Sequence, residues 1–355
     1  MTAPFGWYVH VPFCSVRCDY CAFATWTDRD HLIDDYLAAM GTEIERAVAA
    51  GTPAADTVFV GGGTPSRVPA ASLATVLAAI PCQPDAEVTV ECNPDDVTAD
   101  LLRTYQSAGV NRVSIGVQSM VPHVLAALGR RHDRDNVRAA VDVVRAVGLP
   151  TFNLDIIYGA AGETLEDWSA TLEAVLEMDP PHVSAYGLTV EAGTPLADDP
   201  ARHPDDDLQA DEYELADERL AAAGLANYEV SNWARPGHEC RHNGVYWGQH
   251  DYLGIGAAAH SHRAGRRWWN LRTPERYIAA VAAGHPPEAA GEMLDTATRR
   301  AEGLQLALRT RGGVPLDALD GDELDGLVER HDDRWVLTRA GRLLTNEVAV
   351  RLRGD

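Results

Sequence analysis

Short apolar runs rich in β-branched residues alternate with longer amphipathic stretches along the first half of the chain. A short apolar run favours a buried strand, whereas apolar residues at positions i, i+3 and i+4 favour a helix. The pattern therefore predicts six strands, each followed by a helix. The expected strands are residues 7–11, 57–61, 88–92, 112–117, 152–157 and 183–187.

The stretches between these runs carry the helical pattern. From Leu32 to Val48 the apolar residues fall on one face of a helix. Asp28 or Asp30 can cap its start, and Gly51 can end it. Similar helices are expected at residues 70–80, 98–108, 121–128, 135–147 and 165–178.

Six parallel strands covered by helices make an α/β fold, and we predict a partial (β/α)6 barrel. A doubly wound open sheet has the same local pattern, so periodicity alone leaves both arrangements open. Either arrangement places bound ligands at the carboxyl ends of the strands, and candidate site residues are therefore sought there.

The βα alternation weakens after residue 189. We therefore predict a barrel core over residues 1–190, a bridging segment over 191–271 and a C-terminal domain over 272–355. The last is expected to be small, mainly helical and winged-helix-like. Its pattern predicts a helix at 298–308 and a strand at 334–337.

Composition excludes several classes of function. The 355 residues carry 53 acidic and 30 basic side chains, a net charge of −23, and every basic residue is arginine. An acidic surface repels phosphate backbones, so no nucleic-acid partner is expected. Without lysine, Schiff-base chemistry and a Walker-type phosphate site are excluded. No apolar run is long enough for a membrane span and no signal peptide is present, so a cytoplasmic protein is expected.

Three cysteines, Cys14, Cys18 and Cys21, stand close together directly after the first expected strand. A cubane iron–sulfur cluster takes one thiolate at each of four irons, so three ligands leave one iron open to another molecule. A Cys3His zinc site that includes His10 is the alternative. The other cysteines are scattered, and buried free thiols are expected for them.

The C-x3-C-x2-C loop, with Tyr20 before its last cysteine, resembles the loop of the radical SAM enzymes. The resemblance implies that Cys14, Cys18 and Cys21 hold a [4Fe–4S] cluster. It also implies that the amino and carboxylate groups of S-adenosylmethionine chelate the open iron.

Polar or glycine residues recur where the next strands end. The second strand ends in Gly61-Gly62-Gly63-Thr64-Pro65, the third contains Glu91, the fourth is followed by Gln118, and the fifth carries Asp155. Their order is similar to that of the coproporphyrinogen oxidase-like branch of radical SAM proteins. The resemblance implies that S-adenosylmethionine is surrounded by Tyr8, Tyr20, Gly62, Gly63, Thr64, Glu91, Gln118, Arg130 and Asp155.

The stretch His242-Asn243-x-x-Tyr246-Trp247 lies in a region rich in histidine. An imidazole is a ready axial ligand for haem iron, and the neighbouring aromatic rings can pack on a porphyrin face. Core packing is the alternative explanation of a histidine beside aromatic residues. The stretch resembles the signature of the haem-binding chaperones of the same branch, which implies a haem site that includes His242.

Two features differ from the oxygen-independent coproporphyrinogen III oxidase, a radical SAM oxidative decarboxylase. Its N-terminal extension is missing, and Phe23 stands where it has a further cysteine. The resemblance therefore implies a haem chaperone. That oxidase is the alternative function. A zinc-binding structural protein, which follows from the Cys3His alternative, is the second alternative. The expected partners are haem and respiratory haem proteins, contacted transiently and linked to membranes. A homodimer and cleavage of S-adenosylmethionine are left open.

Overall fold

The six predicted strands form a curved parallel sheet in the computed structural model, which describes residues 3–353. They pair in chain order, which is the order of a barrel wound in one direction, whereas a doubly wound sheet reverses its order at a switch point. The partial (β/α)6 barrel is therefore confirmed. The strands are β1 (Gly6–Val11), β2 (Ala55–Gly62), β3 (Cys82–Cys92), β4 (Arg112–Gln118), β5 (Thr151–Tyr158) and β6 (His182–Gly187).

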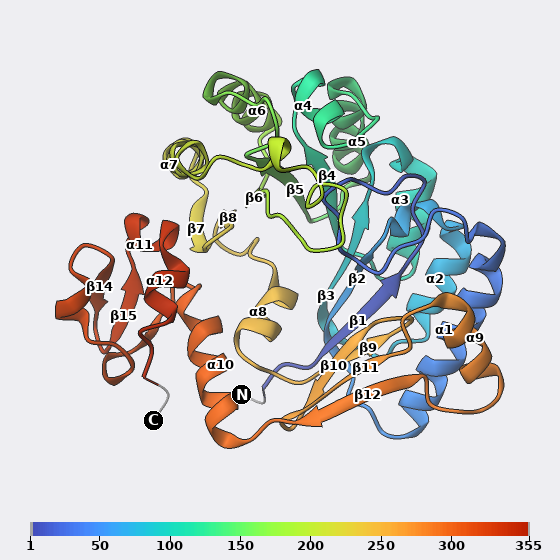
Figure 1. The fold of residues 1–355 in the computed structure, drawn as a ribbon. Helices are drawn as coiled ribbons and strands as arrows, with labels where there is room; N and C mark the ends of the chain where they lie inside the picture. The colour runs from blue at the N-terminus through green and yellow to red at the C-terminus, as the bar shows by residue number, and fades with distance from the viewer. Residues whose placement is uncertain (1–2, 354–355) are drawn as a thin grey trace.

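The helices that follow these strands cover the outer face of the sheet (Figure 1). Side chains of Thr98, Asp133 and Thr164 cap the starts of three of them, as their sequences favour. The first helix begins later than predicted, since residues 30–32 form a separate 3-10 turn. The helices are α1 (Ile33–Ala49), α2 (Ala70–Ala78), α3 (Ala99–Ser107), α4 (Pro122–Ala127), α5 (Arg134–Val147) and α6 (Leu165–Glu177).

The two faces of the parallel strands differ in polarity. Val9, Val60 and Val90 are fully buried in the core formed with the helices. On the alternate positions, which face the inside of the barrel, the strands carry polar groups such as Ser114 and Asn153. Parallel strands usually bury apolar side chains on both faces, so a polar inner face indicates a ligand site.

Short strands that the sequence pattern did not predict extend the sheet on both sides to twelve strands. On one side β9 (Tyr252–Ile255) pairs in parallel with β1, and three antiparallel strands follow it. On the other side two short strands are added to β6. The added strands are β10 (His260–Arg263), β11 (Arg266–Asn270), β12 (Glu288–Met293), β8 (Asn232–Ala234) and β7 (Ala226–Glu229).

Three further helices belong to this large unit. Helix α7 (Asp206–Ala222) packs beside α6, and α9 (Pro274–Ala282) packs against α1. Helix α8 (Arg241–Trp247) lies against β2 on the inner side of the sheet, since its His242 stacks on Phe59. In the described part of the chain, no helix has the length and apolar character that crossing a membrane requires.

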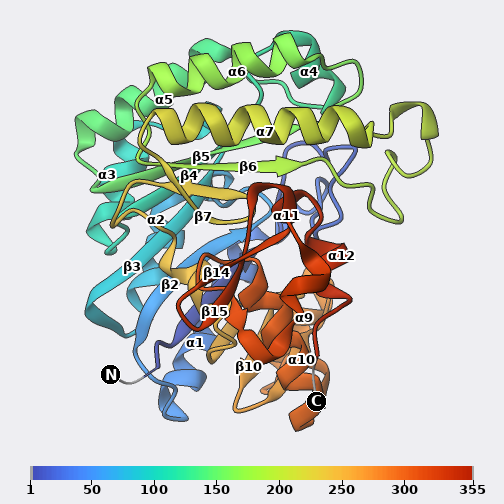
Figure 2. The same cartoon turned by 90° about the vertical axis from the view of Figure 1, so that its left-hand side faces the viewer.

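The C-terminal residues form a second, smaller unit with its own three-stranded sheet and its own apolar cluster (Figure 2). The expected strand at 334–337 is present as β15. Because β12 and α9 join the barrel instead, we propose that the boundary lies near residue 295. The elements of this unit are α10 (Thr296–Leu308), β13 (Val314–Pro315), β14 (Val328–His331), β15 (Arg334–Leu337), α11 (Arg339–Leu343) and α12 (Thr345–Ala349).

A buried carboxylate, Asp217 on α7, joins the two units. It accepts hydrogen bonds from Arg339 Nε at 2.7 Å and from both Nη atoms of Arg342 at 3.0 and 2.9 Å. The indole nitrogen of Trp233 donates a further bond at 2.9 Å. The small unit is therefore held to the barrel by a nearly buried ion pair with a full set of hydrogen bonds.

Candidate functional site

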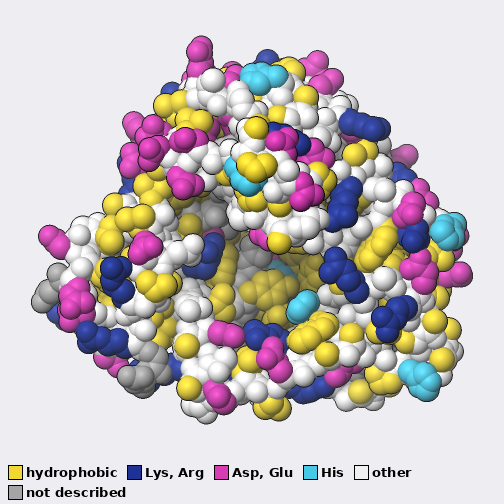
Figure 3. Space-filling model, viewed as in Figure 1, with side chains coloured by type: hydrophobic (Ala, Val, Ile, Leu, Met, Phe, Trp, Pro, Cys, Tyr) yellow, Lys and Arg dark blue, Asp and Glu magenta, His cyan; other side chains and the backbone are white. Residues whose placement is uncertain are grey.

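A cleft of about 720 Å³ opens at the carboxyl ends of the parallel strands. Figure 3 shows the molecule hollowed on this face. The cleft brings together eleven of the thirteen residues predicted for the site, and leaves out Tyr8 and His242. The eleven are Cys14, Cys18, Cys21, Tyr20, Gly62, Gly63, Thr64, Glu91, Gln118, Arg130 and Asp155.

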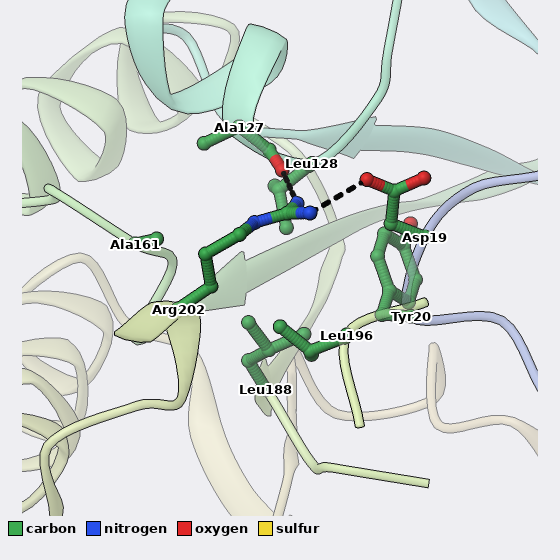
Figure 4. A pocket seen from close by; sticks show the side chains of 8 residues that line it. All are labelled: Asp19, Tyr20, Ala127, Leu128, Ala161, Leu188, Leu196 and Arg202. Carbon is green, nitrogen blue, oxygen red and sulfur yellow. Dashed lines mark hydrogen bonds and ion pairs between the residues drawn. The ribbon is translucent and has the colours of Figure 1, made fainter. Parts of the chain in front are cut away.

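The loop that carries the three cysteines follows β1 directly and is fixed at several points. Cys14 N donates to the carbonyl of Trp26 at 3.0 Å. On the far side, Arg202 lies between the Asp19 carboxylate, at 2.9 Å, and the Ala127 carbonyl, at 2.8 Å (Figure 4). Arg202, which lies in the acidic loop before α7, thus holds the cysteine loop in place.

Two polar side chains approach the cysteine sulfurs. Thr64 Oγ1 lies 3.7 Å from Cys14 Sγ, and Arg130 Nη1 lies 3.6 Å from Cys18 Sγ. Burial raises the pKa of the Cys14 and Cys21 thiols, so bound cationic irons are needed to favour their thiolate forms. The loop therefore presents three unpaired thiols, with a threonine and an arginine beside them, to the cleft.

His10, the fourth ligand of the alternative zinc site, is not directed at the cysteines. Its Nε2 donates to the carbonyl of Ala24 at 3.0 Å, so its Nδ1 accepts from the Tyr8 hydroxyl, also at 3.0 Å. Among the described residues, no three His, Cys, Asp or Glu side chains are placed to share one metal ion. A cubane instead binds each thiolate at a different iron, so its ligands stand further apart. The geometry favours the cluster.

The glycines after β2 allow the cysteine loop and the strand end to lie against each other. Gly62 has a φ of +110°, and a Cβ there would meet the ring of His10 at 2.4 Å. A Cβ on Gly63 would meet the carbonyl oxygens of Phe13 and Val11 at 2.7 and 2.8 Å. These positions require glycine because the cysteine loop packs on them, in addition to lining the cleft.

Two partly buried carboxyl groups, on β3 and β5, face the cleft. Glu91 Oε2 accepts from Gly62 N at 3.2 Å, and burial, with the charge of Asp155, raises the pKa of Glu91 to about 8. Asp155 accepts from Ser114 Oγ at 2.7 Å and from Asn153 Nδ2 at 2.8 Å. Two acidic groups in mutual repulsion favour a ligand that brings ammonium or hydroxyl donors.

Replacing Glu91 by Gln should weaken binding of S-adenosylmethionine by about 10- to 100-fold, because Gln cannot ionise beside the ammonium of the ligand as the Glu91 carboxyl can. The iron content of the reconstituted protein should stay at the wild-type level, since Glu91 does not contact the cysteines. Equilibrium binding and iron analysis measure the two effects. Unchanged affinity for S-adenosylmethionine would show that Glu91 does not contribute to the binding site. Glu45→Gln, on α1 and outside the cleft, is the control.

Gln118 and Arg130 enter the cleft from the fourth βα unit. Gln118 has a φ of +64°, a backbone conformation uncommon in residues other than glycine and often found at functional sites. Arg130 Nη2 donates to the carbonyl of Gly116 at 3.2 Å, and its Nε is a buried donor without a partner among the described residues. Buried donors normally have a hydrogen-bond partner, and a bound ligand can supply the acceptor that this Nε atom lacks.

His242 lies outside the cleft and is fully buried on α8. Its Nδ1 is bonded to Thr57 Oγ1 at 2.9 Å and its Nε2 to the Tyr246 hydroxyl at 2.8 Å. Burial lowers the pKa of His242 to about 3, so the ring is neutral. Haem ligation by His242 stays a prediction, and it requires the ring to give up one of these two bonds.

The other aromatic residues of the same motif build the inner side of the barrel. The Tyr246 ring meets that of Tyr252 edge to face, with centroids 4.7 Å apart, and Trp247 packs against Tyr228 at 5.8 Å. The start of α8 is held by Glu87, whose carboxylate accepts from the backbone nitrogens of Arg241 and His242. Tyr228, Tyr246, Trp247 and Tyr252 thus form an aromatic floor on the inner side of the barrel, as the core-packing alternative expects.

Ser114 and Tyr186 are among the cleft-lining residues that were not predicted from the sequence. Ser114 lies two positions before Gly116 and four before Gln118, so strand alternation along β4 was a signal that could have placed it in the site. Tyr186 is 40 % exposed within the cleft although it lies on a central strand. Both add polar groups to the inner face.

Comparison with known proteins identifies several proteins that are similar to this chain. Residues 8–175 match the radical SAM superfamily. Heme chaperone HemW of Mycobacterium tuberculosis is 43% identical over 99% of this chain and 95% of its own length. The same protein of Bacillus subtilis is 33% identical over 98% of this chain and 99% of its own length. HemW of Escherichia coli is 40% identical over 72% of this chain and 70% of its own length.

Among solved structures, coproporphyrinogen III oxidase (HemN) of Escherichia coli, described as a radical SAM enzyme, has a similar fold. The TM-score is 0.86, and the match covers 98% of this chain and 89% of that protein. Sequence identity is 24%, so this likeness concerns the fold. It extends over both the barrel and the C-terminal unit, which together make up the described chain.

Proposed function

We propose that this chain, which belongs to the HemW family of radical SAM proteins, is a haem chaperone that holds a [4Fe–4S] cluster and S-adenosylmethionine and delivers haem. The observation that carries the proposal is the 43% identity to a heme chaperone over 99% of the chain. The arrangement of the cleft supports the cofactor part of the proposal, because it gathers residues of the types that both groups need.

The residues present fit both cofactors. Cys14, Cys18 and Cys21 would hold the cluster, and the volume of about 720 Å³ leaves room for a nucleoside-sized ligand beside it. Glu91 and Asp155 would accept hydrogen bonds from the ammonium and ribose hydroxyls of S-adenosylmethionine. Bound together, the cluster and S-adenosylmethionine supply one-electron chemistry. The surrounding residues would bind and orient the ligand, and residues of the cysteine loop line the cleft beside it.

Haem is the cargo in this proposal, and respiratory haem proteins are the acceptors. Contact with acceptors linked to membranes would be transient. The resemblance alone supports the identity of the acceptors. A cytoplasmic location also stays a prediction, and a homodimer stays open.

The proposal is tested against the oxidase alternative with one preparation. Anaerobically reconstituted protein is incubated with S-adenosylmethionine, a reductant and coproporphyrinogen III, and separately titrated with haem. We expect a Soret band from bound haem and no decarboxylated porphyrinogen. Turnover of coproporphyrinogen would contradict the chaperone proposal and favour the decarboxylase. Zinc without iron or sulfide in the purified protein would favour the structural alternative instead.

A further inference from the structure

A haem ligand must present a ring nitrogen that an iron atom can reach. The segment 238–262 contains five histidines, and hydrogen bonds already engage three of them. His242 is bonded at both nitrogens, His238 Nδ1 is bonded to Thr151 Oγ1, and His262 is 6% exposed with Nδ1 on the carbonyl of His250. Of the five histidines, only His250, which is partly buried, and His260 have no hydrogen bond to the ring among the described residues.

His260 differs from these because it is exposed. Among residues 3–353, no side chain or backbone group forms a hydrogen bond with its imidazole. It lies on β10, the antiparallel neighbour of β9. The ring nitrogens of this exposed side chain are therefore without a hydrogen-bond partner among the described residues.

The strand register places His260 on the inner face of the barrel. Residues paired across strands, and residues two apart along a strand, point to the same side of a sheet. Tyr252 pairs with Gly6 of β1, which lies two residues before Tyr8, and His262 pairs with Tyr252. His260, two residues before His262, therefore points to the same side as Tyr8.

Trp269 fixes the plane of the His260 ring. The two residues are opposite each other in the β10–β11 pair. Their rings are stacked, with centroids 5.6 Å apart and an angle of 28° between the planes. Stacking on the indole covers one face of the imidazole and leaves its edge, where the nitrogens lie, uncovered.

The surroundings suit an apolar, planar ligand. Tyr246 and Tyr252, from the aromatic floor described above, lie on this same inner face. Figure 3 shows hydrophobic and histidine side chains together within the hollow. A flat macrocycle can pack on such a surface while an exposed imidazole meets its metal.

We propose that His260 is an axial ligand of the haem iron and that Trp269 is the positioning residue that orients it. This inference rests on the proposed haem chaperone function and deepens it. In this proposal the exposed histidine on the inner face binds the iron, and the buried His242 packs within the aromatic floor.

Haem titration of the full-length protein, followed by the Soret band, tests the assignment. His260→Ala should weaken haem binding at least 10-fold and shift the Soret maximum. Added imidazole should restore the wild-type spectrum, which a misfolded protein could not do. His285→Ala, at another exposed histidine, is the matched control and should bind as the wild type does.

Trp269→Leu should change the low-spin electron paramagnetic resonance signal of bound ferric haem, and Trp269→Phe should restore it. If the wild type binds haem while His260→Ala keeps its affinity and spectrum, the assignment of His260 is overturned and the chaperone proposal stands. If the wild type itself binds no haem, the chaperone proposal fails, and the assignment fails with it.

Discussion

Replacing Cys14, Cys18 and Cys21 together by Ala should abolish cluster assembly. The thiolates are the protein's only bonds to the irons in the proposed site, and the nearby Thr64 and Arg130 side chains cannot replace them as ligands. Iron and sulfide, expected at about four of each per wild-type chain, should fall to background. The broad visible absorption should disappear as well.

Cys82→Ala is the matched control, because Cys82 is an exposed free thiol outside the cleft. It should assemble the cluster as the wild type does. Haem binding should survive in the triple variant, since His260 lies on another part of the inner face. A triple variant that retains iron and sulfide would refute the assignment of this loop.

Asp217→Ala should destabilise the protein by about 3–5 kcal/mol, the usual cost of removing one partner of a buried ion pair. The change leaves Arg342 and the Trp233 indole without their acceptor, and it removes the main ionic contact between α7 and α11. Denaturant unfolding measures the loss. Glu218→Ala, at the exposed neighbouring position, should change stability by less than about 0.5 kcal/mol.

Asp217 also gives the protein a specific sensitivity to acid. Burial opposes its ionisation, but the hydrogen bonds and charge of Arg342 outweigh burial and hold the pKa of Asp217 below its usual value. Its contribution to stability is therefore present above the unfolded pKa of about 3.9 and lost as the pH falls through the lower folded value. Asp217→Ala should lack this part of the acid dependence. An equal loss in both proteins would contradict the assignment.

The barrel was predictable because its six strands are short runs rich in apolar, β-branched residues that end in polar or glycine residues. The same feature located most of the site, since the carboxyl ends of parallel strands meet at one edge. Strands β7 to β12 were missed because they are short, mostly antiparallel and in part exposed, so they carry no strong periodicity. Asp217 was missed because its arginine partners lie more than a hundred positions further along the chain.

His242 shows the limit of a motif read in sequence. A histidine followed by a tyrosine four positions later is equally suited to a metalloporphyrin and to a packed helix face. The structure pairs the two by a hydrogen bond of 2.8 Å, and the other ring nitrogen of His242 is bonded to Thr57 of β2, a contact that depends on the tertiary fold. Which histidine of the region is exposed depends on strand register, and sequence alone does not determine that.

Haem transfer tests the central claim most directly. Protein loaded with one equivalent of haem, with its cluster reconstituted, is mixed with the haem-free form of a respiratory haem protein, and both Soret bands are followed in time. The account predicts that the donor band decays as the acceptor band grows, faster than with the same amount of free haem. Haem that stays on the loaded protein, or transfers no faster than free haem, would contradict it.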